Sequence, residues 1–242
     1  MKNKLTFIVA TLAIALLGSC SNNPKNERST LHSTQGTEPQ EEVNIGQFNE
    51  IEVAGAMQVY FSQDGNYSLR IEAPIEMKDK IVTYVSGKSL FISTKDEIMG
   101  ADVSFPMSDV KVYVTSPLIK DVKMSGSGTF TATSAIDAKR FDLDLNGSGN
   151  VFLNGLLSCS FLDIELEGSG DIRISDAKVD KLESEVSGSG NINIENIAAN
   201  SIINTISGAG NIKVKGSAKS NTQSITGSGK VDITELTVEN IK

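Results

Sequence analysis

The sequence predicts an all-β protein whose C-terminal half is a parallel β-helix, a solenoid of stacked turns of about 20 residues each. Three observations lead to this prediction. The tripeptide Gly-Ser-Gly recurs at a nearly constant spacing, apolar residues alternate with polar ones between its copies, and no stretch has the apolar spacing of a helix of two or more turns. The chain has 242 residues, of which 21 are glycines, and the placement of those glycines is more informative than their number.

Residues 1–19 have the features of a lipoprotein signal peptide. Lys2 and Lys4 make a positive start, and residues 5–17 are apolar apart from two threonines, a run shorter than the about 20 residues that a transmembrane helix needs. The following Leu17-Gly18-Ser19-Cys20 resembles a bacterial lipobox, in which cleavage before the cysteine leaves a thiol that accepts a diacylglycerol. We therefore predict lipid attachment at Cys20 and a stable membrane anchor. The alternative is an ordinary secretory signal that happens to contain a cysteine.

Residues 20–45 are predicted to form a flexible tether, because they are polar, contain Pro24 and Pro39 and show no apolar period. The single histidine, His32, lies in this segment, where we expect neither metal binding nor catalysis. The net charge of the whole chain is −8, and loss of the leader leaves 20 basic residues against 30 acidic ones, about −10. This acidic balance argues against a nucleic-acid-binding protein, which needs clustered lysine and arginine.

Residues 46–120 are predicted to form a β-rich but less regular half. Short alternating strands are separated by turn signals such as Gln63-Asp64-Gly65-Asn66, and the clearest strand contains Val110, Val112 and Val114. This pattern fits either a small sandwich or a set of irregular turns that caps the solenoid.

Residues 121–242 are predicted to form the regular solenoid. Six Gly-Ser-Gly or Gly-Ala-Gly tripeptides divide this segment, and their first glycines are separated by 21, 21, 20, 20 and 19 residues. A chain that turns a corner in every repeat needs backbone conformations with φ > 0, which glycine reaches without a penalty from Cβ. We therefore predict structural roles for the twelve turn glycines: Gly126, Gly128, Gly147, Gly149, Gly168, Gly170, Gly188, Gly190, Gly208, Gly210, Gly227 and Gly229.

Aligned on the first glycine, the positions two residues before it and four and six residues after it are aliphatic in nearly every copy. They predict rows of like side chains along a dry core. The row nine residues after the glycine is looser: Ala135, Leu156, Ala177, Ile197, Ser217 and Leu236. In another row the later turns carry polar residues, and we expect looser packing there. These are Ser184, Asn204 and Gln223, in place of Val122, Leu143 and Ile164.

The glycine turns do not predict a ligand site. A phosphate-binding loop would need Lys-Ser or Lys-Thr after the glycines, and a calcium-binding β-roll would need an aspartate in each short repeat. Only one of the six tripeptides is followed by aspartate, Asp171. We therefore predict no cofactor and no bound metal. Cys159 has no basic neighbour in the sequence, so we predict a small buried apolar residue rather than a nucleophile.

Four segments and the repeated glycine turns carry a resemblance to a known family. The segments are Gly46-Gln47-Phe48-Asn49-Glu50-Ile51-Glu52-Val53-Ala54-Gly55, Val59-Tyr60-Phe61-Ser62-Gln63-Asp64-Gly65, Leu69-Arg70-Ile71-Glu72-Ala73 and Gly87-Lys88-Ser89-Leu90-Phe91-Ile92. Over about residues 46–236 the chain resembles the putative auto-transporter adhesin, head GIN domain family of Gram-negative bacteria. The resemblance implies a parallel β-helical architecture in both halves, a lipid-anchored or secreted context and an adhesin role. It supplies no catalytic residues.

The sequence predicts a non-enzymatic, adhesin-like binding or scaffold module of the cell envelope. Its predicted partners are a membrane, through the lipid on Cys20, and an extracellular glycan or protein ligand, while the open strand edges leave end-to-end self-association open. We expect an outer-membrane lipoprotein because Ser21, rather than the usual inner-membrane retention residue aspartate, follows the cysteine. Whether the solenoid faces the periplasm or the outside of the cell is undetermined.

The alternative is a carbohydrate-active enzyme, either a polysaccharide lyase or a glycosidase-like protein, because parallel β-helices host such activities. Sugar subsites favour exposed aromatic platforms, and the chain has no tryptophan. Glycoside hydrolysis also needs two carboxylates that face each other across a cleft. Most of the candidate carboxylates alternate outward with the strand period, which predicts a solvated face. They are Asp142, Asp144, Asp163, Glu165, Glu167 and Asp171.

Overall fold

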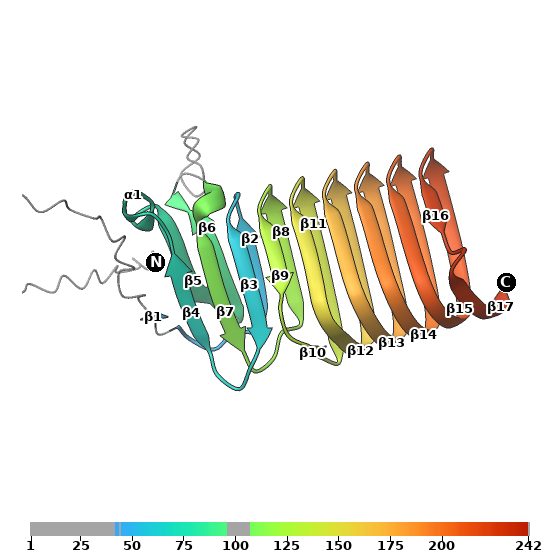
Figure 1. Cartoon of the computed structure of the whole chain (residues 1–242), viewed down its shortest axis with the longest axis horizontal. Helices are drawn as coiled ribbons and strands as arrows, with labels where there is room; N and C mark the ends of the chain where they lie inside the picture. Colours follow the sequence, from blue (N-terminus) through green and yellow to red (C-terminus); the bar gives the residue numbers. More distant parts are fainter. Residues whose placement is uncertain (1–41, 44, 96–106, 242) are drawn as a thin grey trace, which may run out of the picture. The chain divides into compact units, whose positions relative to one another are not determined.

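The structure, a computed structural model, describes residues 42–43, 45–95 and 107–241. The predicted leader, Cys20 and His32 lie outside the described residues. The described residues belong to one compact unit, in which strands stack side by side in a single long row (Figure 1). The all-β class and the β-solenoid are confirmed, with about six solenoid turns and almost no helix.

The regular half begins at β8, and every pairing between its successive turns is parallel. The first glycine of each tripeptide pairs with the first glycine of the next, so the turns are stacked in register. Its strands are β8 (Asp121–Gly126), β9 (Thr129–Ala132), β10 (Ile136–Asp137), β11 (Arg140–Gly147), β12 (Asn150–Gly168), β13 (Asp171–Gly188), β14 (Asn191–Gly208), β15 (Asn211–Gly227), β16 (Lys230–Asp232) and β17 (Leu236–Ile241).

The two glycine positions of each tripeptide require glycine for different structural reasons. The first has a φ between 103° and 141° in all six copies, a region that side chains with a Cβ rarely adopt. The second has no such φ, but a Cβ placed on it would lie closer than 3.0 Å to a backbone oxygen of the neighbouring turn. The expectation of φ > 0 therefore describes the first glycine, and close approach of two backbones explains the second.

The looser row of the sequence alignment is wrong by one residue in three of its six turns. The strand register aligns Ile136, Leu157 and Gly216 with Ala177, in place of Ala135, Leu156 and Ser217. The register shifts once after Leu153 and once after Ile194, because the turns differ in length by one residue. Leu157 is buried, whereas its neighbour Leu156 is 47% exposed.

The N-terminal half forms irregular turns of the same stack rather than a sandwich. Strand β2 (Glu50–Ala54) pairs in parallel with β6 (Ser89–Thr94) and β8, and β3 (Gln58–Gln63) pairs in parallel with β7 (Lys111–Ser116) and β9. The turn made by β2 and β3 therefore lies between that of β6 and β7 and that of β8 and β9. The order of turns in space differs from their order in the chain.

Antiparallel strands and short helices close the N-terminal end of the stack. Strand β4 (Ser68–Glu72) pairs antiparallel with β7 and with β1 (Glu42–Val43), and β5 (Ile81–Ser86) pairs antiparallel with β6. The one-turn helix α1 (Ile75–Lys78), which starts after Pro74, and the 3-10 helix η1 (Met107–Asp109) each bury a methionine. An apolar end of the core is covered in this way.

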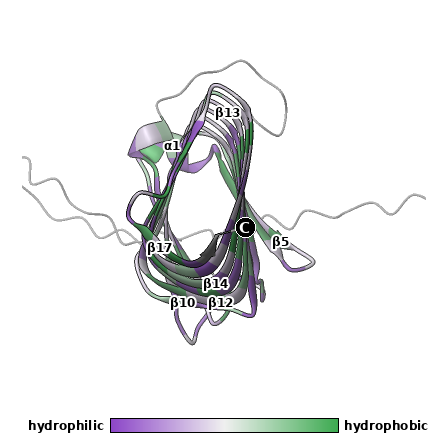
Figure 2. Ribbon diagram, turned by 90° about the vertical axis from the view of Figure 1, so that its right-hand side faces the viewer, coloured by the Kyte–Doolittle hydropathy of each residue, from purple (hydrophilic) through white to green (hydrophobic). Residues whose placement is uncertain are grey.

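The core runs along the whole stack between the sheets. The view along the stack in Figure 2 shows the turns superposed around a common interior. Leu145, Leu166, Val186 and Ile206 form one continuous row of inward side chains, each at most 1% exposed. Such rows of aliphatic side chains remove apolar surface from water in every turn, and this is the main stabilising contribution of the repeat.

Three polar side chains lie inside this core near its C-terminal end. Ser184 and Asn204 point inward as the sequence predicts, and both are buried. The predicted third member, Gln223, pairs with Asn204 in the strand register but is exposed, and the third buried polar side chain is Asn221, which lies opposite Ile202 in the neighbouring row. The Ser184 hydroxyl donates to Asn204 Oδ1 at 2.7 Å, and Asn204 Nδ2 donates to Asn221 Oδ1 at 3.1 Å. Hydrogen bonds thus link three turns where we expected only looser packing.

Candidate functional site

An open groove of about 560 Å³ crosses successive turns of the regular half. The middle segments of β12, β13, β14 and β15 position it, with residues of β10 and β17 at its two ends. Because the turns are in register, equivalent side chains line up across the groove. One of the resulting rows is Asp137, Ser158, Lys178, Ala198, Ser217 and Thr237.

The side chains of the groove are small in the middle and polar or charged around it. The row beside the first one contains Cys159, Val179, Ala199 and Ala218. Besides the polar members of the first row, the polar side chains include those of Asp180, Asn200, Lys219 and Glu239, and no aromatic residue lines the groove. Asn200 Nδ2 donates to Asp180 Oδ1 at 3.0 Å. A surface of this kind offers an extended chain hydrogen-bond donors and acceptors, and it contains both basic and acidic side chains.

Cys159 lies at one end of the groove but is not suited to nucleophilic chemistry. Its side chain is buried, 8% exposed, as the sequence predicts. Burial, with a smaller contribution from nearby carboxylates, raises the pKa of its thiol to about 12. The thiol is therefore protonated at neutral pH, whereas the thiolate is the reactive form.

A second surface, the acidic face, lies on the outward side of β2, β8, β11 and the last parts of β12 and β13. Its first row of carboxylates consists of Glu50, Asp121, Asp142, Asp163 and Glu183. A second row consists of Glu52, Lys123, Asp144, Glu165 and Glu185. Neighbouring strands are about 4.8 Å apart, so these carboxylates are closely spaced. Four of the six carboxylates singled out from the sequence fall in these two rows.

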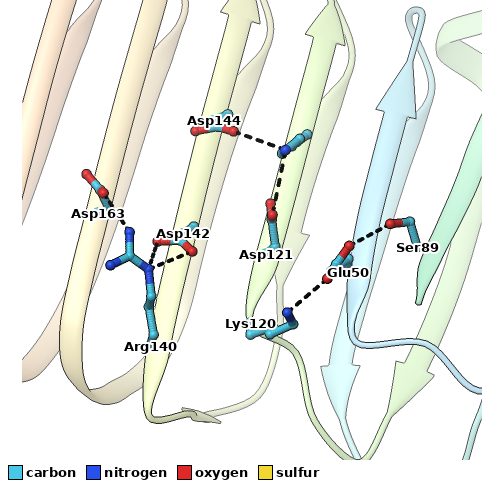
Figure 3. Close-up of polar contacts among 9 residues, drawn as sticks. Glu50, Ser89, Lys120, Asp121, Arg140, Asp142, Asp144 and Asp163 are labelled. Atoms are coloured by element: carbon cyan, nitrogen blue, oxygen red, sulfur yellow. Dashed lines mark hydrogen bonds and ion pairs between the residues drawn. The ribbon is translucent and has the colours of Figure 1, made fainter. Parts of the chain in front are cut away.

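Basic side chains bridge the carboxylates of the first row (Figure 3). Arg140 contacts Asp142 at 2.7 Å and Asp163 at 2.9 Å, and so links two turns. Lys120 Nζ lies 2.9 Å from a Glu50 oxygen, while the other Glu50 oxygen accepts a hydrogen bond from the Ser89 hydroxyl at 2.7 Å. These pairs lie along one sheet, where the carboxylates of successive turns lie side by side.

Partial burial changes the acidity of this face. Burial raises the pKa of Asp121 to about 6, and Asp144 and Asp142 add to this while Lys123 opposes it. Burial likewise raises the pKa values of Asp144 and Asp163. The pKa of Glu50 is lowered instead, first by the hydrogen bond from Ser89 and then by Lys120.

We predict that Asp121→Asn raises the melting temperature at pH 8 and that the gain shrinks at pH 5. The pKa of Asp121 in the folded protein, about 6, lies above the value near 3.8 of an unperturbed aspartate, so the folded state binds this proton more tightly. Its ionised form therefore destabilises the fold fully above about pH 6, and this penalty disappears as the pH falls toward 4. Thermal denaturation of both proteins at the two pH values measures the effect.

The exposed Asp64→Asn serves as the control for loss of one negative charge. A gain of the same size at pH 5 and pH 8, or an equal gain in the control, would contradict the role of burial at Asp121.

The other predicted features are placed as follows. The lipid attachment residue, Cys20, lies outside the described residues. Within the described part of the chain, no three histidine, cysteine, aspartate or glutamate side chains gather so that they could hold a metal ion. In the same ranges no helix is long and apolar enough to cross a membrane.

Sequence reasoning missed the groove. The signal was present in the small residues Ala198, Ala199, Ser217 and Ala218, which recur about 20 positions apart just after the looser aliphatic row. With the register of that row wrong by one residue in three turns, these positions could not be aligned from the sequence.

The structural class of this protein is a parallel β-solenoid whose turns build the groove and the acidic face, since stacked repeats create extended surfaces. The chain belongs to the family described as putative auto-transporter adhesin, head GIN domain, whose model matches residues 47–177 and 158–242. The resemblance noted in the sequence is thereby confirmed.

Solved structures of other bacterial proteins share the fold. A putative lipid binding protein from Parabacteroides distasonis is 23% identical, with a TM-score of 0.63, and the match covers 81% of this chain and 96% of that chain. A putative adhesin from Bacteroides fragilis is 21% identical, with a TM-score of 0.61 and the same coverage. A second P. distasonis protein, also a putative adhesin, is 17% identical with a TM-score of 0.65, covering 83% and 95%. No curated protein matches the chain.

Proposed function

We propose that this chain is a non-enzymatic, adhesin-like binding module that holds an extended extracellular glycan or protein segment along the groove. The observation that carries the proposal is the in-register arrangement of small and polar side chains across successive turns, between Asp137 and Thr237. A rigid array of this kind presents one contact position per turn, about 4.8 Å apart, to a long ligand. The description of the family as adhesins supports a binding role.

The competing function is a carbohydrate-active enzyme. A glycosidase needs an acid and a base or nucleophile on two sides of the bond that it cleaves. Here the closely spaced carboxylates lie on one sheet, and Arg140 holds Asp142 and Asp163 in ion pairs. This arrangement favours a structural and solubilising role for the acidic face over catalysis.

One experiment separates the two functions. The compact unit, residues 39–242, would be immobilised and incubated with a panel of polysaccharides, while retention and the release of reducing or unsaturated ends are both measured. Saturable retention without release is the expected result. Turnover of any polysaccharide would overturn the non-enzymatic proposal, and the absence of any retention would remove glycans as ligands and leave protein segments.

Filling the groove is predicted to weaken binding. Ala198→Phe places a ring in the middle of the groove and is expected to raise the apparent Kd for the retained polysaccharide by about tenfold or more. Ser207→Phe is the matched control, since Ser207 is also an exposed residue of β14 but lies outside the groove. Equal losses in both variants would contradict the assignment of the groove as the binding site.

We further propose that a lipid on Cys20 anchors the module to the envelope, in the outer membrane. The proposal rests on the lipobox-like Leu17-Gly18-Ser19-Cys20, on the polar tether and on Ser21. An adhesin needs its binding surface held at the cell envelope, which fits such an anchor. We predict that cells fed a labelled fatty acid incorporate the label into the parent chain and not into Cys20→Ala. Label in both proteins would contradict the attachment site.

A further inference from the structure

The two ends of the stack are covered to different extents. At the N-terminal end, antiparallel β4 and β5 and helix α1 cover the last parallel strands. At the C-terminal end, β16 covers only residues 211–213 of β15, and β17 covers only residues 216–221. Among the described residues, no strand pairs with the outer side of residues 222–227. We call this segment the open edge.

The open edge leaves one row of the core uncovered. Leu145, Leu166, Val186 and Ile206 are at most 1% exposed, whereas Ile225, the next member of the row, is 45% exposed. The backbone N–H and C=O groups on the outer side of this segment also have no strand partner in the described ranges. An edge that combines free backbone groups with an inward apolar side chain is a template for one more strand.

Natural proteins protect such edges with charges, prolines or bulges, and the open edge has none of these devices. Residues 220–229 contain no charged side chain and no proline, although the whole chain has a net charge of −8. Because the chain is acidic, two copies that approach each other through most other surfaces repel each other. At the open edge no like charges oppose each other, so the edges of two copies can approach.

At the N-terminal end, the outer strand β5 is protected. In β5 the inward-facing Ile81 and Val85 pack against the core. The exposed Tyr84 points outward and stacks on Phe91 with ring centroids 4.8 Å apart. Phe91 of the same copy therefore covers part of the Tyr84 ring, and Ile81 and Val85 cover the core beneath β5.

We propose that the open edge pairs with the open edge of a second copy, forming a symmetric dimer joined at the C-terminal ends of the two stacks. The same surface serves both partners, so the association is closed and stops at two copies. Antiparallel pairing puts directly opposite side chains on the same face of a sheet. In the register centred on Ile225, this residue lies opposite its own copy, and each Ile225 covers the other.

The dimer does not depend on the proposed ligand. It leaves the N-terminal end, with β1, at the far side of each copy, and it involves residues 222–227 rather than the middle segments that build the groove. Each dimer would present two grooves, so a long ligand could be held at two places with a gain from multivalency.

The test uses the compact unit, residues 39–242, which contains the complete described core. The solved structures that share the fold align with 81–83% of this chain. The molar mass is measured by light scattering after size-exclusion chromatography for the parent, Ile225→Lys and Tyr84→Lys. The two substituted side chains are matched, since they are 45% and 46% exposed and lie on edge strands at opposite ends.

The parent and Tyr84→Lys are expected to have twice the mass of one chain, and Ile225→Lys the mass of one chain with an unchanged circular dichroism spectrum. A monomeric parent, or a dimer that Ile225→Lys leaves intact, would overturn the proposal. A second measurement covers the case in which the lysine variant does not fold. Ile225→Cys in the same unit should be joined between copies by a short thiol cross-linker, whereas Tyr84→Cys should not, because residue 84 lies at the end of the stack away from the open edge. Cys159 is buried and contributes no accessible thiol in either variant.

Discussion

Gly168→Ala is expected to lower the free energy of unfolding by about 2–5 kcal/mol. Gly168 has a φ of 112°, and a left-handed conformation costs a residue with a Cβ about 1–2 kcal/mol. The new methyl group would also lie against the backbone of Gly147 in the neighbouring turn. The carbonyl oxygen of Gly147 accepts hydrogen bonds from Ser169 and Gly170, so moving it disturbs two bonds, and such overpacking costs about 1–3 kcal/mol more.

Urea denaturation followed by circular dichroism measures this loss. Gly65→Ala is the matched control, because Gly65 lies in an exposed turn, has no left-handed φ and has no atom within 4 Å of the added methyl group. We expect the control to change stability by less than about 0.5 kcal/mol. A similar loss in both proteins would mean that stacking of the tripeptides does not limit the residue at position 168.

Asn204→Leu is expected to destabilise the protein by up to about 4 kcal/mol although it makes the core more apolar. Asn204 is fully buried, accepts a hydrogen bond from Ser184 and donates one to Asn221. The leucine leaves two buried polar groups without a partner, at about 1–3 kcal/mol each. Burial of the leucine side chain returns about 1.5–2 kcal/mol of that loss.

The triple variant Ser184→Val, Asn204→Leu, Asn221→Leu tests the reason. With all three polar groups removed, no buried donor or acceptor is left unsatisfied, and we expect a stability equal to or above that of the parent. The free energies of the parent, single and triple variants are compared by the same urea denaturation. If the triple variant were less stable than the parent, the three hydrogen-bonded side chains would contribute net stability of their own. If it were also less stable than the single variant, unsatisfied polar groups would not be the reason for the loss.

The regular half could be predicted from the sequence because its information is local and repeated. Each turn contains its own glycines and its own alternating strands, so the spacing of 19 to 21 residues gives the period of the stack directly. The prediction was wrong where two candidates stood side by side, as at Leu156 and Leu157. A local pattern cannot tell which of two adjacent leucines faces inward when the turn contains an extra residue.

The sequence predicts that the irregular half consists of strands, but it does not predict how these strands pair. Strands β2, β3, β6 and β7 have similar alternating patterns, and pairing between them is set by contacts between residues that are far apart in the chain. No local sequence feature predicts that β8 pairs with β2 rather than with a strand of the preceding β6–β7 turn. The acidic face is an intermediate case, since the strand period predicts outward carboxylates but only the register brings Asp121, Asp142 and Asp163 into one row.

The sequence by itself therefore determined the fold class, the period of the turns and the positions that only glycine can occupy, because each depends on the backbone and side chains within one repeat. The tertiary structure decided the order of the first turns, the register that lines up the groove, the hydrogen bonds among Ser184, Asn204 and Asn221, and the uncovered Ile225. These features arise where one turn meets another, and pairing across turns is a long-range choice that a single repeat does not specify.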